Sequence, residues 1–291
     1  MGMRIRTNVS SLTAQRHMSQ NNNDMKGSLE KLSSGYRINK SADDAAGLAI
    51  TENLRGKIRG MNVAKRNAND AVSMVQVAEG SMNEMSNMLI RMRELTIQAS
   101  TDTLGDRERE YLNREYTQLV DELDRIGKST EFNGLRMFDP EQELEEFVIQ
   151  VGVNESTPDE NKDTISINLE GLKFDSDSLG FGKDAEIGPA DGGDGPDRQE
   201  ISEKLTTIDD ALSKIASERA TLGAIQNRLQ SAIGNLEISV ENQSTAKSRI
   251  KDVDFASETA KLTQSRIMTA SNLSVLTQAN QAPEMALRLL G

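Results

Sequence analysis

The sequence predicts a mainly α-helical fold: long antiparallel helices in a coiled-coil-like bundle, paired N- and C-terminal helices, and a small β-hairpin. Three observations predict it. Apolar residues recur every seven positions over residues 201–240, and a second pattern of similar period follows residue 44. Aromatic residues make up only 3% of the chain, which is too few for the thick core of a globular enzyme.

Residues 201–240 carry the clearest pattern. Its two rows are Ile201, Ile208, Ile215, Leu222, Leu229 and Leu236, and Leu205, Leu212, Arg219, Gln226, Ile233 and Val240. A helix of this length spans about 60 Å, and each Leu or Ile contributes about 1.5–3 kcal/mol only where a partner covers it. We therefore expect a helix seam that contains Leu205, Leu212, Leu222, Leu229 and Leu236.

The segment after residue 44 is the natural antiparallel partner. Residues 41–44 fit an S-x-x-D capping box, which predicts a helix start. The apolar row that follows is Leu54, Ile58, Met61, Ala68, Val72, Val75 and Met82, and it then drifts to Met85, Leu89, Met92, Thr96 and Ala99. We expect Val72 and Val75 to lie in the seam.

The two ends of the chain share an unusual composition. Residues 7–33 keep a helical apolar spacing with Ser, Asn, Gln and Thr between; a disordered polar terminus is the alternative. Residues 255–291 are also helical in pattern and carry no charge from 267 to 283. Such faces suit helices that pack on several neighbours at once, and other copies of the chain could supply those neighbours.

The middle of the chain departs from the long-helix pattern. A shorter amphipathic helix is expected from Asp106 to Gly127, which would end it as a C′ glycine. Period-two alternation predicts a β-hairpin at about 145–171. Residues 174–198, rich in Gly, Asp and Ser, predict an exposed acidic loop; a calcium site is the alternative, although the spacing is not that of an EF-hand.

Composition excludes several functions. There is no Cys, and His17 is the only histidine, so we expect no catalytic site, no metal site and no cofactor. The net charge of −12 is +2 over residues 1–130, −14 over 131–200 and 0 over 201–291. The acidic middle argues against nucleic-acid binding. No run is apolar enough for membrane insertion, and the first residues lack the apolar core of a cleaved signal peptide.

Several segments resemble bacterial flagellin. KLSSGYRINKSADDAAGLAI (31–50), RNANDAVSMVQVAEGSMNEM (66–85), RMRELTIQAS (91–100) and EFNGLRMF (131–138) are similar to its N-terminal part. LGAIQNRLQSAIGNLEISVENQSTAKSRIKDVDFASETAKL (222–262) and VLTQANQAPEMALRLL (275–290) are similar to its C-terminal part. The resemblance covers residues 1–138 and 201–291 and implies a compact flagellin without large outer domains.

The resemblance implies two domains. Residues 1–43 and 252–291 would form an inner terminal-helix domain, the filament core, and residues 44–251 a helical rod domain with the hairpin and the acidic loop. It implies a non-enzymatic structural subunit that self-assembles into the helical flagellar filament used for swimming motility. The alternatives are a hook–filament junction protein of the same superfamily and a monomeric coiled-coil adaptor, for which the uncharged ends would be unexplained.

Partners and location follow from the resemblance alone. The partner of this chain would be itself, as a helical homopolymer, together with the flagellar type III export apparatus, an export chaperone, a filament cap and junction proteins. The location would be extracellular, in the filament, after export without a cleaved signal peptide. Flagellins recognised by the vertebrate Toll-like receptor for flagellin have contacts that match Arg91, Leu95 and Glu115, and we expect Leu95 to be exposed beside Arg91.

Overall fold

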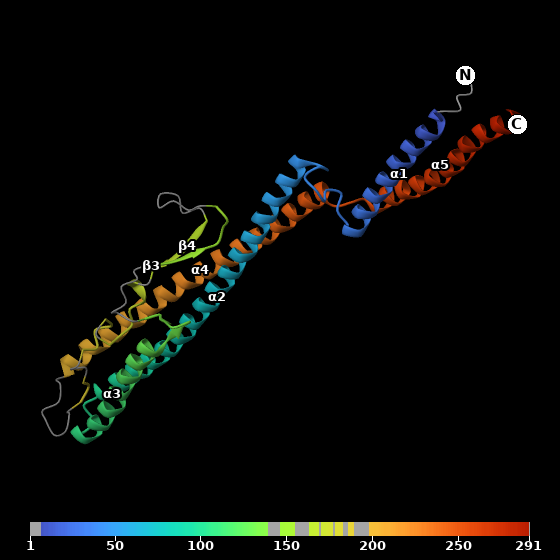
Figure 1. Ribbon diagram of the computed structural model, residues 1–291. Coiled ribbons are helices and arrows are strands. Elements are labelled where there is room, and N and C mark those ends of the chain that lie inside the picture. The colour runs from blue at the N-terminus through green and yellow to red at the C-terminus, as the bar shows by residue number, and fades with distance from the viewer. Residues whose placement is uncertain are drawn as a thin grey trace. The chain divides into compact units, whose positions relative to one another are not determined.

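The computed structural model describes residues 7–138, 146–154, 163–168, 170–176, 178–182, 186–188 and 198–290. Within these residues the helices are α1 (Val9–Ser34), α2 (Ala45–Ala99), α3 (Asp106–Ser129), α4 (Arg198–Lys251) and α5 (Phe255–Leu290) (Figure 1). The strands are β1 (Glu131–Phe132), β2 (Leu135–Arg136), β3 (Glu146–Gln150) and β4 (Thr164–Asn168), followed by a 3₁₀ turn at Glu170–Leu172. The predicted mainly α-helical fold is confirmed.

The chain divides into two compact units. The terminal unit comprises Met1–Ile58 and Glu241–Gly291, and the central unit comprises Arg59–Val240. The division falls within α2 and α4, so each of these helices contributes to both units. The sequence-based boundaries, at residues 43 and 252, fall instead at the connections between helices.

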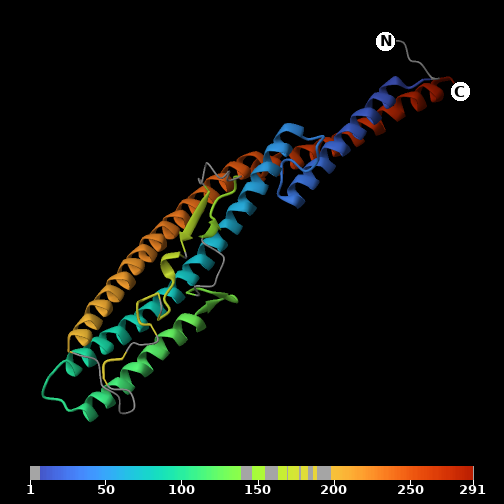
Figure 2. The same cartoon turned by 90° about the vertical axis from the view of Figure 1, so that its left-hand side faces the viewer.

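In the central unit, α2 and α4 run antiparallel (Figure 2). Three ion pairs mark their register. Lys65 pairs with Glu237, Glu79 lies 3.9 Å from Arg219, and Arg93 pairs with Asp209 at 2.7 Å. All six side chains are at least one-third exposed to solvent, so each pair contributes about 1 kcal/mol at most. The buried apolar side chains between the helices hold them together.

The two apolar rows of α4 differ in burial. Every member of the row from Ile201 to Leu236 is buried, whereas Leu205, Leu212 and the rest of the second row are only half-buried. On α2, Val75 is buried and Val72 is half-buried. Ala211 and Ile225, outside both rows, are buried instead. The core is therefore wider than a two-helix seam, because other elements cover α4 and α2.

The predicted hairpin is formed by β3 and β4. Phe147 lies opposite Ile167, and Ile149 lies opposite Ile165. Ile149, Ile165 and Ile167 are buried in the core, whereas Val148 faces solvent. A second, shorter antiparallel pair, β1–β2, was not predicted. Its turn is Asn133-Gly134, and both residues have positive φ (54° and 79°), as a two-residue type I′ turn requires.

The prediction of an exposed loop at 174–198 is wrong for the described residues between 174 and 188. Phe174, Leu179, Phe181 and Ile187 are all buried in the core. The remaining positions, 177, 183–185 and 189–197, lie outside the described residues. Charge dominates the composition of this segment, but four apolar side chains at irregular spacing decide its placement.

Gly127 shows how closely this segment packs. It does not end α3, as the sequence suggested, because the helix continues to Ser129. A Cβ on Gly127 would lie 2.5 Å from the carbonyl oxygen of Phe174, so only glycine allows this approach. The Phe174 ring meets Phe138 edge to face with ring centroids 5.6 Å apart. The buried side chains among the described residues between 174 and 188 thus line a further side of the core.

We predict that Leu229→Asp destabilises the central unit by several kcal/mol, because it places an unpaired charge where the native side chain is fully buried. Gln226 on the same helix is half-buried, so Gln226→Leu should leave the free energy of unfolding unchanged or raise it. Chemical denaturation of the dilute, monomeric chain measures both. Equal stability of Leu229→Asp and the parent would contradict the assigned seam.

We also predict that Phe174→Ala lowers the free energy of unfolding by about 3–5 kcal/mol, the usual cost of an emptied aromatic site. The matched control is Ser178→Ala, an exposed position in the same segment, which should change it by about 0.5 kcal/mol or less. If both substitutions have the same small effect, residues 174–188 are a surface loop after all.

Candidate assembly surface on the terminal helices

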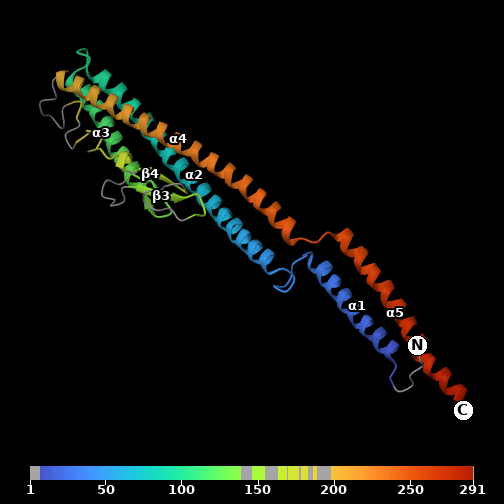
Figure 3. The same ribbon diagram turned by 90° about the horizontal axis from the view of Figure 1, so that it is seen from above.

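Helices α1 and α5 of the terminal unit lie side by side and antiparallel (Figure 3). The buried residues of α1 are Ser11, Ala14, Asn21 and Ser28, and the last three are spaced by seven. The sequence places a heptad stripe here, but small and polar side chains occupy it. The interface between the two helices is therefore a polar seam rather than an apolar one.

Hydrogen bonds connect the seam along its length. The Asn8 amide donates to the Ala279 carbonyl at 2.8 Å, and the Ser11 hydroxyl donates to Oδ1 of Asn280 at 2.9 Å. The Asn21 amide donates both to the Ser265 carbonyl and to Oγ1 of Thr269, at 3.0 and 3.1 Å. Each such bond contributes about 0.5–1.5 kcal/mol net, so the seam specifies alignment more than it stabilises.

Among the side chains that the structure describes, the seam contains one buried carboxylate, that of Glu258. The hydroxyl of Ser28 donates to it at 2.7 Å, and Lys261 lies 3.4 Å away. The Ser28 hydrogen bond, aided by Lys261 and Lys31, lowers the pKa of Glu258 although burial opposes the shift. Glu258 is thus held ionised at neutral pH inside the seam.

Most of the described large apolar side chains of the pair are exposed, although Leu262 is buried and Met18, Met25, Leu32 and Leu276 are half-buried. The exposed ones, each between 43% and 65% exposed, are Val9, Leu12, Leu29, Phe255, Ile267, Met268, Leu273 and Val275. Scattered exposed apolar residues are normal, but here they outnumber the buried ones on the same two helices. In a self-contained helical hairpin the large apolar side chains are buried between the helices, so this distribution is the reverse of the usual one.

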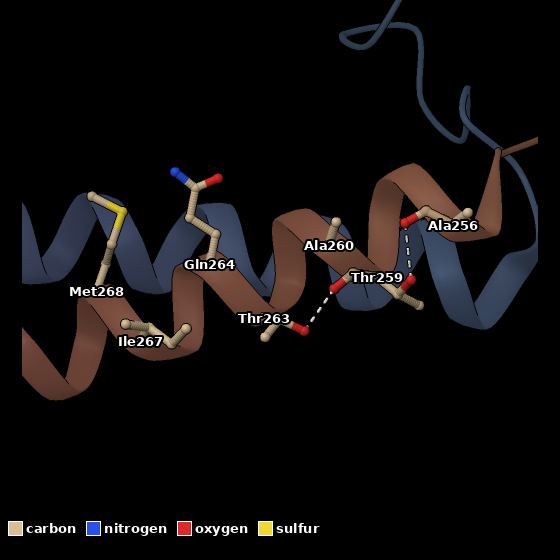
Figure 4. A pocket seen from close by; sticks show the side chains of 7 residues that line it. All are labelled: Ala256, Thr259, Ala260, Thr263, Gln264, Ile267 and Met268. Carbon is tan, nitrogen blue, oxygen red and sulfur yellow. Dashed lines mark hydrogen bonds between the residues drawn. The ribbon is translucent and has the colours of Figure 1, made fainter.

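One face of α5 forms an open groove of about 540 Å3, lined by Ala256, Thr259, Ala260, Thr263, Gln264, Ile267 and Met268 (Figure 4). Thr259 and Thr263 donate their hydroxyls to carbonyls of the preceding turn, at 2.7 and 2.8 Å. With these donors satisfied inside the helix, the groove needs few polar partners from whatever covers it. We call this surface the α5 groove.

The connections next to α1 and α5 are joined to each other, which the sequence did not reveal. Gly35, with φ of 74°, ends α1 and accepts a hydrogen bond from the Val253 amide at 3.0 Å. The Arg37 guanidinium donates to the Ile250 carbonyl at 2.7 Å, and Tyr36 forms a β-bridge with Asp252. In the sequence, the signal that could have indicated this connection is the pair Tyr36 and Arg37 directly after Gly35.

The residues matched to an innate-receptor contact lie in the central unit. Arg91 binds Glu115 at 2.8 Å and Glu94 at 3.0 Å, and all three are about half exposed. The expectation that Leu95 is exposed is wrong: it is 1% exposed and lies in the core between α2 and its neighbours. The side chain at Leu95 points inward because it continues the Leu89–Met92 stripe.

The described residues contain neither a candidate metal site nor a candidate membrane span. No group of three or more His, Asp or Glu side chains in these ranges could hold a metal ion. None of the helices described is long and apolar enough to cross a membrane.

A polar internal seam with an apolar outer surface defines a helical structural protein of the assembling type. Residues 5–143 match the bacterial flagellin N-terminal helical region, and residues 205–290 match the bacterial flagellin C-terminal helical region. The chain therefore belongs to the bacterial flagellin family.

Individual relatives agree with this assignment. A flagellin of Bacillus subtilis (strain 168) is 36% identical over 99% of this chain and 100% of its own length. The flagellar filament 33 kDa core protein of Treponema phagedenis is 37% identical with the same coverage. A putative flagellar hook-associated protein from Vibrio parahaemolyticus, at 16% identity and a TM-score of 0.54, covers 72% of this chain and 100% of that chain, and shows the fold alone.

We predict that Ser28→Ala raises the pKa of Glu258 toward its ordinary value of 4.5, because the strongest bond to the ionised form is lost. Since the folded-state pKa is the lower one, the carboxylate stabilises the seam above pH 4.5 and this contribution is lost as pH falls through the folded value. A carboxyl NMR titration of the monomer measures it. Ser11→Ala, whose hydroxyl bonds a neutral amide, is the control; an unshifted Glu258 in Ser28→Ala would contradict the assignment.

Proposed function

We propose that this chain is a structural subunit of the helical flagellar filament and that the α1–α5 pair makes its principal contacts with other copies. The observation that carries the proposal is the α1–α5 pair, in which hydrogen-bonded small and polar residues of α1 are buried while most of the large apolar residues of the two helices are exposed. Buried against neighbours, each of those apolar side chains would contribute about 1.5–3 kcal/mol.

Assembly of identical copies through two different surfaces gives an open helical polymer when the contact does not close into a ring. At 3.6 residues per turn, the exposed Ile267, Met268 and Leu273 are separated by about 100° or more around the axis of α5, which supports contact with more than one neighbour. In this proposal residues 1–43 and 252–291 form the inner, filament-core domain, and the helix seam of the central unit holds the rod domain together.

The alternatives account for fewer observations. A monomeric coiled-coil adaptor would have no use for the exposed apolar residues of α1 and α5. A hook–filament junction protein would have a similar fold, and the fold likeness to a hook-associated protein fits that as well. The full-length relatives at 36–37% identity, however, are named as a flagellin and a filament core protein.

Family membership also suggests further partners. Export would use the flagellar type III apparatus and a chaperone, without a cleaved signal peptide, and a cap and junction proteins would contact the filament ends. The finished filament is an extracellular appendage used for motility. Recognition by the vertebrate Toll-like receptor for flagellin would rely on Arg91 and Glu115, and it would have to break the salt bridge between them.

We predict that Ile267→Asp and Leu273→Asp each abolish filament formation, because a charge in a covered apolar surface costs several kcal/mol for every copy added. Both side chains are more than half exposed in the single chain, so helix content should not change. Sedimentation and electron microscopy measure assembly, and circular dichroism measures folding.

The matched control is Val148→Asp on β3, an equally exposed apolar residue of the central unit, which should still assemble. Filaments formed by Ile267→Asp and Leu273→Asp at the parent's concentration would contradict the role given to α5.

A further inference from the structure

The methionine side chains differ sharply in their exposure to solvent. Met82, Met85 and Met92 are 0% exposed in the core of the central unit. Met268 of the terminal unit is 47% exposed, and it is the one exposed methionine among those whose side chains the structure describes. The chain contains no Cys, so its oxidisable sulfur atoms are all thioethers. Because oxidation follows exposure, Met268 is the described sulfur that a dissolved oxidant reaches most readily.

Met268 also lies on the surface that the proposed function assigns to contacts with other copies. Its side chain extends from one end of the α5 groove, one helical turn beyond Gln264 (Figure 4). Ile267, which is 65% exposed, lines the groove beside it. The hydroxyls of Thr259 and Thr263 donate to carbonyls of their own helix, so they are not offered to a new acceptor. The groove therefore suits a thioether, which needs no hydrogen-bond donor, better than a polar group.

Oxidation would change this surface without breaking the helix. Hydrogen peroxide transfers one oxygen atom to the sulfur: an S–O bond forms, the O–O bond breaks, the sulfur loses two electrons and water leaves. The sulfoxide is polar and accepts hydrogen bonds. Water hydrates it in the single chain, but a copy that covers the groove removes that water, and an unpaired buried polar group is costly. Oxidation of Met268 therefore opposes assembly and not folding.

We propose that Met268 is an oxidation-sensitive site that controls the addition of a copy to the filament, with the thioether permitting the α5 contact and the sulfoxide preventing it. The inference rests on the proposed function and adds a regulatory chemistry to the same surface. The reverse step needs a dithiol reductant, which supplies two electrons and two protons, so that the oxygen leaves as water and the dithiol becomes a disulfide. Since assembly covers the groove, the modification acts on the free copy.

Peroxide treatment of the full-length monomer, followed by removal of the peroxide, tests this site. Peptide mass spectrometry should find Met268 oxidised before Met82, Met85 and Met92. The critical concentration for assembly should rise about tenfold, as expected for a lost apolar contact, while circular dichroism shows unchanged helix content. A methionine sulfoxide reductase with a dithiol should reverse the rise. In preformed filaments Met268 should oxidise several times more slowly than in the monomer.

Met268→Leu is the matched control, since leucine is apolar, similar in volume and free of sulfur. Its critical concentration should be the same before and after peroxide treatment, which separates Met268 from every other methionine of the chain. Met268→Gln places a polar side chain of similar length at the same position. This variant should raise the critical concentration without any oxidant and should not respond to the reductase.

Three results would overturn the inference while the filament function stands. They are normal assembly of the parent after full conversion of Met268, an equal peroxide response of Met268→Leu and the parent, and normal assembly of Met268→Gln. Equal oxidation of Met268 in filaments and in the monomer would also overturn it, because the groove would then be open after assembly. An untreated parent chain that does not polymerise would overturn the proposed function and this inference with it.

Discussion

Two helices that pack only on each other can bury one narrow stripe of side chains apiece, and this limit governs the terminal unit. In α1 that stripe is filled by small and polar residues, and the space it encloses is closed by hydrogen bonds such as Ser28 to Glu258. Most of the large aliphatic residues described on the two helices are left exposed, with Leu262 the buried exception. The pair is folded but incomplete, and further helices are needed to cover it.

In the central unit, other elements of the same chain cover the long helices. There α2 and α4 are covered by α3, by the hairpin and by residues around Phe174, so that methionines and leucines on α2 such as Met85 and Leu89 become fully buried. Lys214 shows how the cover is attached: its ammonium lies 5.7 Å from the centre of the Phe174 ring and donates to carbonyls of Lys173 and Ser178. Most of the buried large apolar side chains lie in this unit, whereas among the described residues of the terminal unit the exposed ones outnumber the buried ones.

The sequence predicted the burial that follows from periodicity, and it missed the burial that depends on a third packing element. The heptad row through Leu222 and Leu229 is buried because any partner helix would bury it. Leu95 and Phe174 were misplaced, because burial there comes from α3 and from an aperiodic segment that no repeat reveals. The helix cap lies three residues later than the capping box predicted: the carboxylate of Asp44, not the hydroxyl of Ser41, accepts the Gly47 amide at the start of α2. For the assembly surface, composition indicated that the ends need neighbours, but only the coordinates show that the small residues face inward.

Apolar contacts and charges contribute differently to the strength and to the register of such an assembly. Apolar burial is strong but non-directional, and a surface of Thr, Ala, Ile and Met such as the α5 groove could slide by a turn with little loss of area. Charges at fixed positions on rigid helices contribute less free energy but penalise each wrong register by like-charge contact. In the proposed filament, the apolar surface of the terminal helices would therefore supply the strength of the contact, and charged positions would supply its register.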